Sequence, residues 1–180
     1  MPNSLSEKSK FISYVLRHKP DAIGIRLNKE GWTDIDELLS KTTKPIITRA
    51  ELEQIVAEDE KGRYTIQGNL IRANQGHSTN QVRMIFKKGV PPTKLFHGAD
   101  STAIVEIMKN GLKPMARHHV HLSCDLSTAE QVGGRRRRGY IVLVIDAKKM
   151  LSDGHTFFLS ENGIWLIDHV PPKYLTESKP

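Results

Sequence analysis

The sequence is poor in cysteine and in long apolar stretches, and each shortage restricts what the chain can be. It holds one cysteine, Cys124, so no disulfide framework can form within the chain, and this usage is typical of a reducing compartment. The longest apolar run, residues 141–145, is far shorter than the roughly 20 residues that span a bilayer. The first residues lack the apolar core of a secretory signal. We therefore expect a cytoplasmic protein with no membrane span.

Motifs of several common enzyme classes are also missing. The patterns GxGxxG, GxxxxGK[ST], CxxC, HExxH and GxSxG do not occur. Standard Rossmann cofactor binding, P-loop hydrolysis and zincin chemistry therefore have no support. What the chain does have is a basic balance, 27 Lys and Arg against 20 Asp and Glu, a formal charge of +7. This excess favours a polyanionic partner, with nucleic acid first among the candidates.

The first half of the chain has the pattern of helices followed by a hairpin. Apolar residues at 11, 12, 15 and 16 predict a helix that ends before Pro20. A second helix is predicted over 34–39 with Thr33 as its N-cap, and a third begins at a capping box of Thr48 and Glu51. Residues 63–72, with a turn at 67–69, predict a hairpin. This order is typical of a winged-helix module.

Residues 87–92, two lysines, a glycine, a valine and two prolines, predict a boundary between two domains, 1–88 and 92–180. Beyond it, strands are predicted at 95–97, 119–123, 140–145, 157–159 and 164–167. One helix is predicted from Ser101 to Met108 with Gly111 as its stop, and another from a capping box of Ser127 and Glu130. The fold class expected for the whole chain is α+β.

Basic residues are the first candidates for chemistry. Arg17 and His18 end the first helix, where the helix dipole alone favours cations by about 0.3–1 kcal/mol. Alternatively, both side chains bind a phosphate, since the Arg guanidinium can donate to two oxygens at once and His changes protonation near neutrality. Arg63 opens the hairpin, as either edge protection or a ligand contact. The polar, glycine-bearing stretch 72–78 is either a surface loop or a place for ligand contacts.

Histidines at 118, 119 and 121 suggest a metal site, but the pattern is too sparse for one. On a strand, His119 and His121 share one face while His118 points the other way. Tetrahedral zinc needs three or four convergent ligands, so no metal is expected. The four arginines at 135–138 favour a solvated loop that can add non-specific attraction to phosphates.

Taken together, these segments resemble the tRNA 2′-phosphotransferase family, also described as RNA 2′-phosphotransferases. The matching stretches cover nearly the whole chain in the family's order: 9–20 (SKFISYVLRHKP), 31–32 (GW), 61–64 (KGRY), 71–78 (IRANQGHS), 95–98 (LFHG), 117–123 (RHHVHLS) and 160–166 (SENGIWL). Each stretch alone is a weak signal, and seven in register are specific.

The resemblance implies an N-terminal winged-helix lobe followed by an ADP-ribosyltransferase-like α/β lobe, with NAD bound in the second lobe and RNA between the two. It implies removal of an internal 2′-phosphate from RNA, of the kind left at a tRNA splice junction. NAD is consumed as a co-substrate, and an ADP-ribosylated 2′-phosphate is the intermediate. The products are RNA with a free 2′-OH, ADP-ribose 1″,2″-cyclic phosphate and nicotinamide. We also expect a monomer.

The family's functional residues transfer onto individual positions of this chain. The residues implied to be catalytic are Arg17, His18, Arg63 and Arg117. Those implied to contact NAD are His97, Gly98, Ser123 and Asn162, with Gly98 allowing close approach of the backbone. The chain departs from the family at Ala99, where a threonine is usual, and Ser101 or Thr102 could supply the missing hydroxyl. The role of His18 in proton transfer is open.

Two alternatives remain from the sequence. The first keeps the fold but transfers ADP-ribose to terminal phosphates of RNA or DNA, leaving a stable capped end and no cyclic phosphate. The second is a non-catalytic winged-helix nucleic-acid binder, which would bind RNA without releasing nicotinamide.

Overall fold

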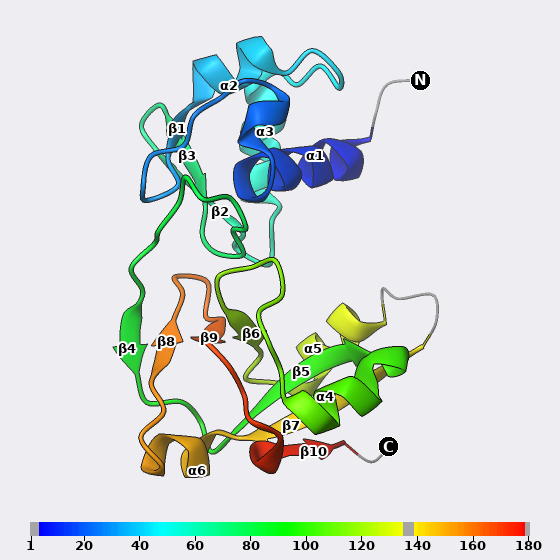
Figure 1. The fold of residues 1–180 in the computed structure, drawn as a ribbon. Coiled ribbons are helices and arrows are strands. Elements are labelled where there is room, and N and C mark those ends of the chain that lie inside the picture. The colour runs from blue at the N-terminus through cyan, green and yellow to red at the C-terminus, as the bar shows by residue number, and fades with distance from the viewer. Residues whose placement is uncertain (1–3, 135–138, 179–180) are drawn as a thin grey trace. The chain divides into compact units, whose positions relative to one another are not determined.

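The computed structural model describes residues 4–134 and 139–178. The chain divides into two compact units, Met1–Ile85 and Phe86–Pro180, and each has its own apolar core (Figure 1). The arginines at 135–138, which the sequence suggested as an accessory phosphate contact, lie outside the described residues.

The described part of the first unit contains three α-helices and one antiparallel sheet. The helices are α1 (Leu5–Arg17), α2 (Ile35–Lys41) and α3 (Arg49–Ala57), with a short 3₁₀ helix, η1 (Pro20–Ala22), after α1. The strands β1 (Thr33–Asp34), β2 (Tyr64–Gln67) and β3 (Leu70–Ala73) pair in the order β1-β3-β2. The predicted hairpin is confirmed as β2 and β3, and Gly68 in its turn has a φ of +60°.

Local sequence explains the first and third helices. The apolar stripe of α1 buries Ile12, Val15 and Leu16 completely, as predicted. The capping box that starts α3 is also confirmed: Thr48 accepts from the N–H of Glu51, and the Glu51 carboxylate accepts from the N–H of Thr48. The same carboxylate lies 2.6 Å from Nζ of Lys8 on α1, which lowers the pKa of Glu51 and ties the two helices together.

The described part of the second unit consists of two antiparallel sheets with helices between their strands. The first sheet has the order β10-β7-β5, and the second has the order β4-β8-β9-β6. The strands are β4 (Lys87–Gly89), β5 (Lys94–Asp100), β6 (Val120–Leu122), β7 (Tyr140–Asp146), β8 (Phe157–Leu159), β9 (Trp165–Ile167) and β10 (Leu175–Glu177). The helices are η2 (Ser101–Ala103), α4 (Ile104–Asn110), α5 (Leu126–Gly133), α6 (Ala147–Ser152) and η3 (Pro172–Tyr174).

Three predicted helix starts are wrong by one or two residues, and all for the same reason. In each case a nearby aspartate caps the first turn in place of the hydroxyl residue: Asp34 caps α2 in place of Thr33, Asp125 caps α5 in place of Ser127, and Asp100 in place of Ser101 caps the 3₁₀ helix η2 that leads into α4. A carboxylate forms charge-assisted bonds with the first N–H groups of a helix and also suits its dipole. The N–H of Glu37 accordingly lowers the pKa of Asp34, and the N–H of Thr128 lowers that of Asp125.

The segment predicted as a domain boundary contains a short strand, because residues 87–89 form β4 and pair with β8. The α+β class holds for the whole chain, since every strand pairing among the described residues is antiparallel and helices lie between the strands. The winged-helix and ADP-ribosyltransferase-like assignments stay predictions. No helix in the described part of the chain is long and apolar enough to cross a membrane.

Candidate active site

Three of the four candidate catalytic residues lie in the first unit, at the end of α1 and just before β2. Arg17 is the last residue of α1, and His18 is its C-cap, whose N–H donates to the carbonyl oxygen of Tyr14 at 2.9 Å. Both residues are half-buried. Arg63 directly precedes β2. The positions of Arg17 and His18 alone fit the helix-dipole explanation, so the contacts around the three residues decide what they can do.

A segment that follows β3 holds the end of α1. The N–H of Ser78 donates to the carbonyl oxygen of Arg17 at 2.9 Å, and the hydroxyl of Ser78 lies 2.9 Å from Nδ1 of His18. Gly76 passes beside the side chain of Arg17, where a Cβ would lie 3.6 Å from Cδ. The φ of Gly76 is +88°, a conformation that favours glycine. Both candidate side chains are therefore contacted by one short stretch of chain.

Arg63 is held by an aspartate that sequence reasoning missed. The carboxylate of Asp59 accepts from the N–H of Arg63 and lies 3.3 Å from its Nη1. The Asp59 side chain is 3% exposed, whereas that of Arg63 is 31% exposed. The guanidinium is thus anchored on one side by a buried carboxylate and still reaches solvent. Asp59 lies two residues before the family-like stretch 61–64, and no pattern in the sequence marks it.

Asn74, the residue directly after β3, fixes the backbone around Arg63. This buried residue donates through its N–H to the carbonyl oxygen of Arg63 at 2.8 Å, and through Nδ2 to that of Gly62 at 2.8 Å. Its Oδ1 accepts from the hydroxyl of Thr65 at 2.7 Å. A buried amide with this many partners specifies one local conformation, because leaving any of them unsatisfied is costly.

Residues 74–79, which we call the bracket segment, therefore contact all three candidate catalytic residues of this unit. The Asn74 end holds Arg63, and the Gly76 to Ser78 end holds Arg17 and His18. Guanidinium forks and an imidazole are the donors that phosphate groups favour in proteins. A phosphomonoester carries about −1.5 to −2 charge at neutral pH, so this set is chemically suited to one.

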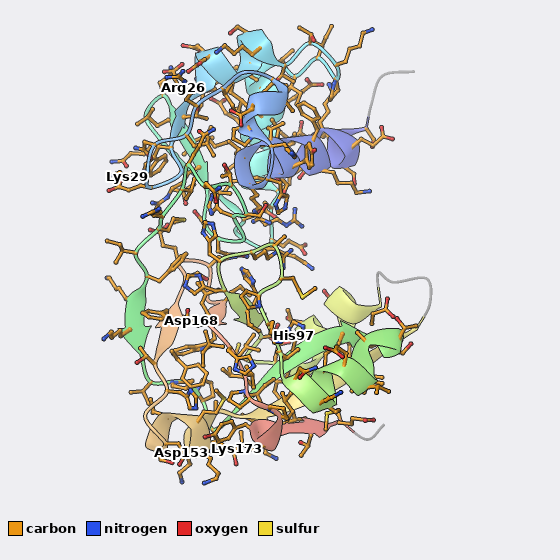
Figure 2. The ribbon with its side chains drawn as sticks, in the orientation of Figure 1. Arg26, Lys29, His97, Asp153, Asp168 and Lys173 are labelled. Atoms are coloured by element: carbon orange, nitrogen blue, oxygen red, sulfur yellow. The ribbon has the colours of Figure 1, made fainter. Side chains whose placement is uncertain are left out.

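In the second unit, His97 lies on β5 with its ring held against β6 (Figure 2). Nδ1 of His97 donates to the carbonyl oxygen of His121 at 2.9 Å. Because a carbonyl oxygen can only accept, Nδ1 must carry the proton, and Nε2 of the neutral ring is therefore an acceptor. The ring can accept a hydrogen bond from a hydroxyl group such as those of a ribose.

Gly98 has a packing role that the sequence did not reveal. A Cβ at this position would lie 2.2 Å from the carbonyl oxygen of Ala129 and 2.8 Å from the backbone nitrogen of Gly133. Both atoms belong to α5, which therefore packs directly on the backbone of β5. Helix packing alone therefore requires glycine here, and the close approach of NAD to this residue stays a prediction. The neighbouring Ala99 is buried in the core, and the hydroxyl of Thr102 donates to Asp100 at 2.7 Å.

Ser123 and Asn162 lie toward one end of the second sheet. Ser123 exchanges two backbone hydrogen bonds of 2.9 Å with Phe96, next to His97, and so joins β6 to β5. Asn162 lies in the turn between β8 and β9, and its Oδ1 is 2.9 Å from the hydroxyl of the buried Ser160. Because Leu122 pairs with Trp165, this turn lies at the same end of the sheet as Ser123.

Arg117, the fourth candidate catalytic residue, lies in an exposed turn before β6, and its N–H donates to the carbonyl oxygen of Pro114 at 3.1 Å. Nearby, the ring of His119 packs edge-on against Phe86, with 5.6 Å between centroids. Nε2 of His119 lies 3.6 Å from the exposed carboxylate of Asp168 (Figure 2). Burial lowers the pKa of His119, and Asp168 offsets only part of that effect.

The histidines near β6 do not gather around a common point. Within residues 4–134 and 139–178, no group of three or more His, Cys, Asp or Glu side chains is placed to hold a metal ion.

Comparisons with known proteins agree with one another along nearly the whole chain. The sequence model of the family described as "RNA 2'-phosphotransferase, Tpt1 / KptA family" matches residues 3–169. A protein of Rhizobium leguminosarum bv. trifolii is 48% identical over 172 residues, which are 95% of this chain and 93% of its own. A protein of Nostoc punctiforme is 47% identical over 171 residues, 93% of each chain. One of Escherichia coli (strain K12 / MC4100 / BW2952) is 46% identical over 175 residues, 95% of each chain. All three are named "Probable RNA 2'-phosphotransferase".

Proposed function

This chain belongs to the RNA 2′-phosphotransferase family, Tpt1 / KptA, and on that premise we propose that it removes an internal 2′-phosphate from RNA with NAD as co-substrate. In the first step, an oxygen of the RNA 2′-phosphate attacks the anomeric carbon of the nicotinamide ribose, and nicotinamide leaves. In the second, the neighbouring ribose hydroxyl attacks phosphorus, and the bond between phosphorus and the RNA 2′-oxygen breaks. The products are 2′-OH RNA and ADP-ribose 1″,2″-cyclic phosphate.

The observation that carries this proposal is the anchoring of Arg17, His18 and Arg63 by the bracket segment. Two arginines and a histidine held by Ser78, Asp59 and Asn74 are arranged before any ligand arrives, which lowers the cost of ordering them. Such donors position the phosphate and offset the charge that develops on its oxygens in transesterification. Arg117 is assigned to the same catalytic set by the resemblance.

The second unit supplies the proposed NAD contacts. The acceptor Nε2 of His97 fits a ribose hydroxyl, because its tautomer is determined by the bond to His121. Ser123 is attached to the strand that carries His97, and Asn162 lies in a turn at the same sheet end as Ser123. NAD supplies the electrophilic ribose carbon and the leaving group. The protein residues hold it, orient it and exclude water from the reacting carbon.

The test is incubation of the purified protein with a short RNA that bears one internal 2′-phosphate, with and without NAD and with no added metal. We expect loss of the phosphate only with NAD, together with nicotinamide and ADP-ribose cyclic phosphate. ADP-ribose left on a terminal phosphate would replace the proposal with end capping. RNA binding without nicotinamide release would replace it with a binding module.

Variants test the residue assignments in the same assay. Arg63→Ala is expected to lower kcat by at least about 100-fold, as the loss of a transition-state donor does. Arg117→Ala is expected to act in the same way. The matched control is Arg83→Ala, because Arg83 is exposed in the first unit and makes no ion pair with a described residue. Near wild-type turnover in Arg63→Ala would remove Arg63 from the catalytic set.

A further inference from the structure

Two histidines of this protein hold Nδ1 against partners of different chemistry. Nδ1 of His97 faces the carbonyl oxygen of His121 at 2.9 Å, and Nδ1 of His18 faces the hydroxyl of Ser78 at 2.9 Å. A carbonyl only accepts a hydrogen bond, whereas a hydroxyl can donate one or accept one. The ring of His97 is therefore restricted to one tautomer. The contact of His18 is compatible with both neutral tautomers and with the cation.

The hydroxyl of Ser78 is well placed because the chain around it is anchored. The N–H of Ser78 donates to Arg17, as described above. His77 and Thr79, on either side, are 4% and 9% exposed. The ring of His77 packs against Gly31, where a Cβ would lie 3.2 Å from its Nε2. Removing the hydroxyl alone would leave these backbone and packing contacts in place.

We propose that Ser78 is a positioning residue for His18, one that keeps the ring in a single plane whichever of its nitrogens carries a proton. The hydroxyl donates to Nδ1 when Nε2 holds the only proton, and accepts from Nδ1 when that nitrogen is protonated. His18 can then offer Nε2 as a donor or as an acceptor without rotating. The proposal rests on the proposed function in assigning His18 to the RNA phosphate.

The second step of the proposed reaction explains why such a ring is useful. The attacking ribose hydroxyl gives up one proton as its oxygen bonds to phosphorus, and the RNA 2′-oxygen takes up one proton as its bond to phosphorus breaks. A group at the phosphate that holds a proton between these events keeps the step balanced. Arg17, the preceding residue, stays protonated, and the ring of Tyr14 lies tilted to that of His18 with 6.3 Å between centroids.

The experiment compares Ser78→Ala, which lacks the hydroxyl, with Ser78→Thr, which keeps it. Ser78→Ala is expected to lower kcat roughly tenfold to a hundredfold, the range found when the outer hydrogen-bond partner of a metal-ligating histidine is removed. The KM for NAD should stay within about twofold, and Ser78→Thr should restore kcat to within about threefold of wild type. The matched control is Ser40→Ala, which removes an exposed hydroxyl bonded to the backbone of Glu37 and should change nothing.

A double-mutant cycle separates positioning from a merely structural role. If Ser78 acts through His18, adding Ser78→Ala to a His18→Ala protein costs little further activity in single-turnover assays. If Ser78 only supports the fold, the two losses multiply. Multiplied losses, or an unchanged kcat in Ser78→Ala, would overturn the proposal.

Nitrogen-15 NMR of the ring tests the contact without any activity. Ser78→Ala is expected to shift the Nδ1 signal of His18 and leave that of His97 in place, and Ser78→Thr should shift neither. An Nδ1 signal of His18 that does not move in Ser78→Ala would overturn the proposal even in an active enzyme. A wild-type protein inactive on 2′-phosphorylated RNA would instead refute the proposed function, and the NMR result would still decide the role of Ser78.

Discussion

Replacing Gly98 by alanine tests whether this glycine serves helix packing or ligand approach. If it served only the approach of NAD, Gly98→Ala would fold normally and bind NAD weakly. The structure predicts instead that the variant folds poorly, because α5 packs on the backbone of β5 at this residue. We expect loss of stability first, with loss of activity as its consequence.

The geometry sets the size of the effect. A Cβ at Gly98 would lie 2.2 Å from the carbonyl oxygen of Ala129, and ordinary contact begins near 3.4 Å, a shortfall of 1.2 Å (3.4 minus 2.2). The backbone nitrogen of Gly133, one helical turn further along α5, would also be too close to this Cβ. The whole helix must therefore move away from β5. Overpacking a well-filled site costs about 1–3 kcal/mol, and we expect about 3 because the obstacle is backbone.

The assay is thermal and urea unfolding of the purified variant. A loss of about 3 kcal/mol corresponds to a fall in Tm of roughly 6–12 °C for a chain of this size. The control is Gly154→Ala, where φ is +91° but no atom lies within 4 Å, so only about 1–2 kcal/mol of backbone strain is expected. A Gly98→Ala protein as stable as wild type would refute the packing argument.

Three further predictions concern other parts of the molecule. Thr48→Ala should lower the free energy of unfolding by about 1 kcal/mol in urea titrations, because the N–H of Glu51 loses its cap. Burial lowers the pKa of His119 from 6.5, so the unfolded chain binds more protons just below that pH. The free energy of unfolding should therefore fall as pH drops from about 6.5 through the folded pKa, and His119→Phe should flatten this slope in urea titrations between about pH 5 and 7.5. Finally, His97→Ala should raise the KM for NAD about tenfold, the equivalent of one hydrogen bond, with a smaller change in kcat by steady-state kinetics.

Sequence patterns predicted elements well where periodicity was strong and poorly where elements were short. The apolar stripe of α1 and the turn at 67–69 predicted a helix and a hairpin that the structure contains. The helix α6 was missed because six residues are too few to show a period. The strand β4 was missed because its lysines have low strand propensity, and its pairing with β8 lies seventy residues away in the chain.

The candidate site was predictable in its residue types but not in its supports. Arg17, His18 and Arg63 matched a family pattern, and the stretch 72–78 drew attention as polar and glycine-bearing. That Ser78 contacts His18 could not be predicted, because the two residues share no local element. Asp59 was missed for a related reason: nothing in a solvent-exposed acidic stretch shows which carboxylate turns inward.

The bond between Ser78 and His18 joins residues that are 60 positions apart. A ribosome adds about 5–20 residues per second, so roughly 3–12 s separate the synthesis of these two partners. Throughout that interval the nascent chain contains Arg17 and His18 without the contacts that Ser78 later makes with them. Arg17 and His18 are thus synthesised early, and the contacts that orient them form later. A nascent chain that stops short of the bracket segment can attract phosphates without orienting them.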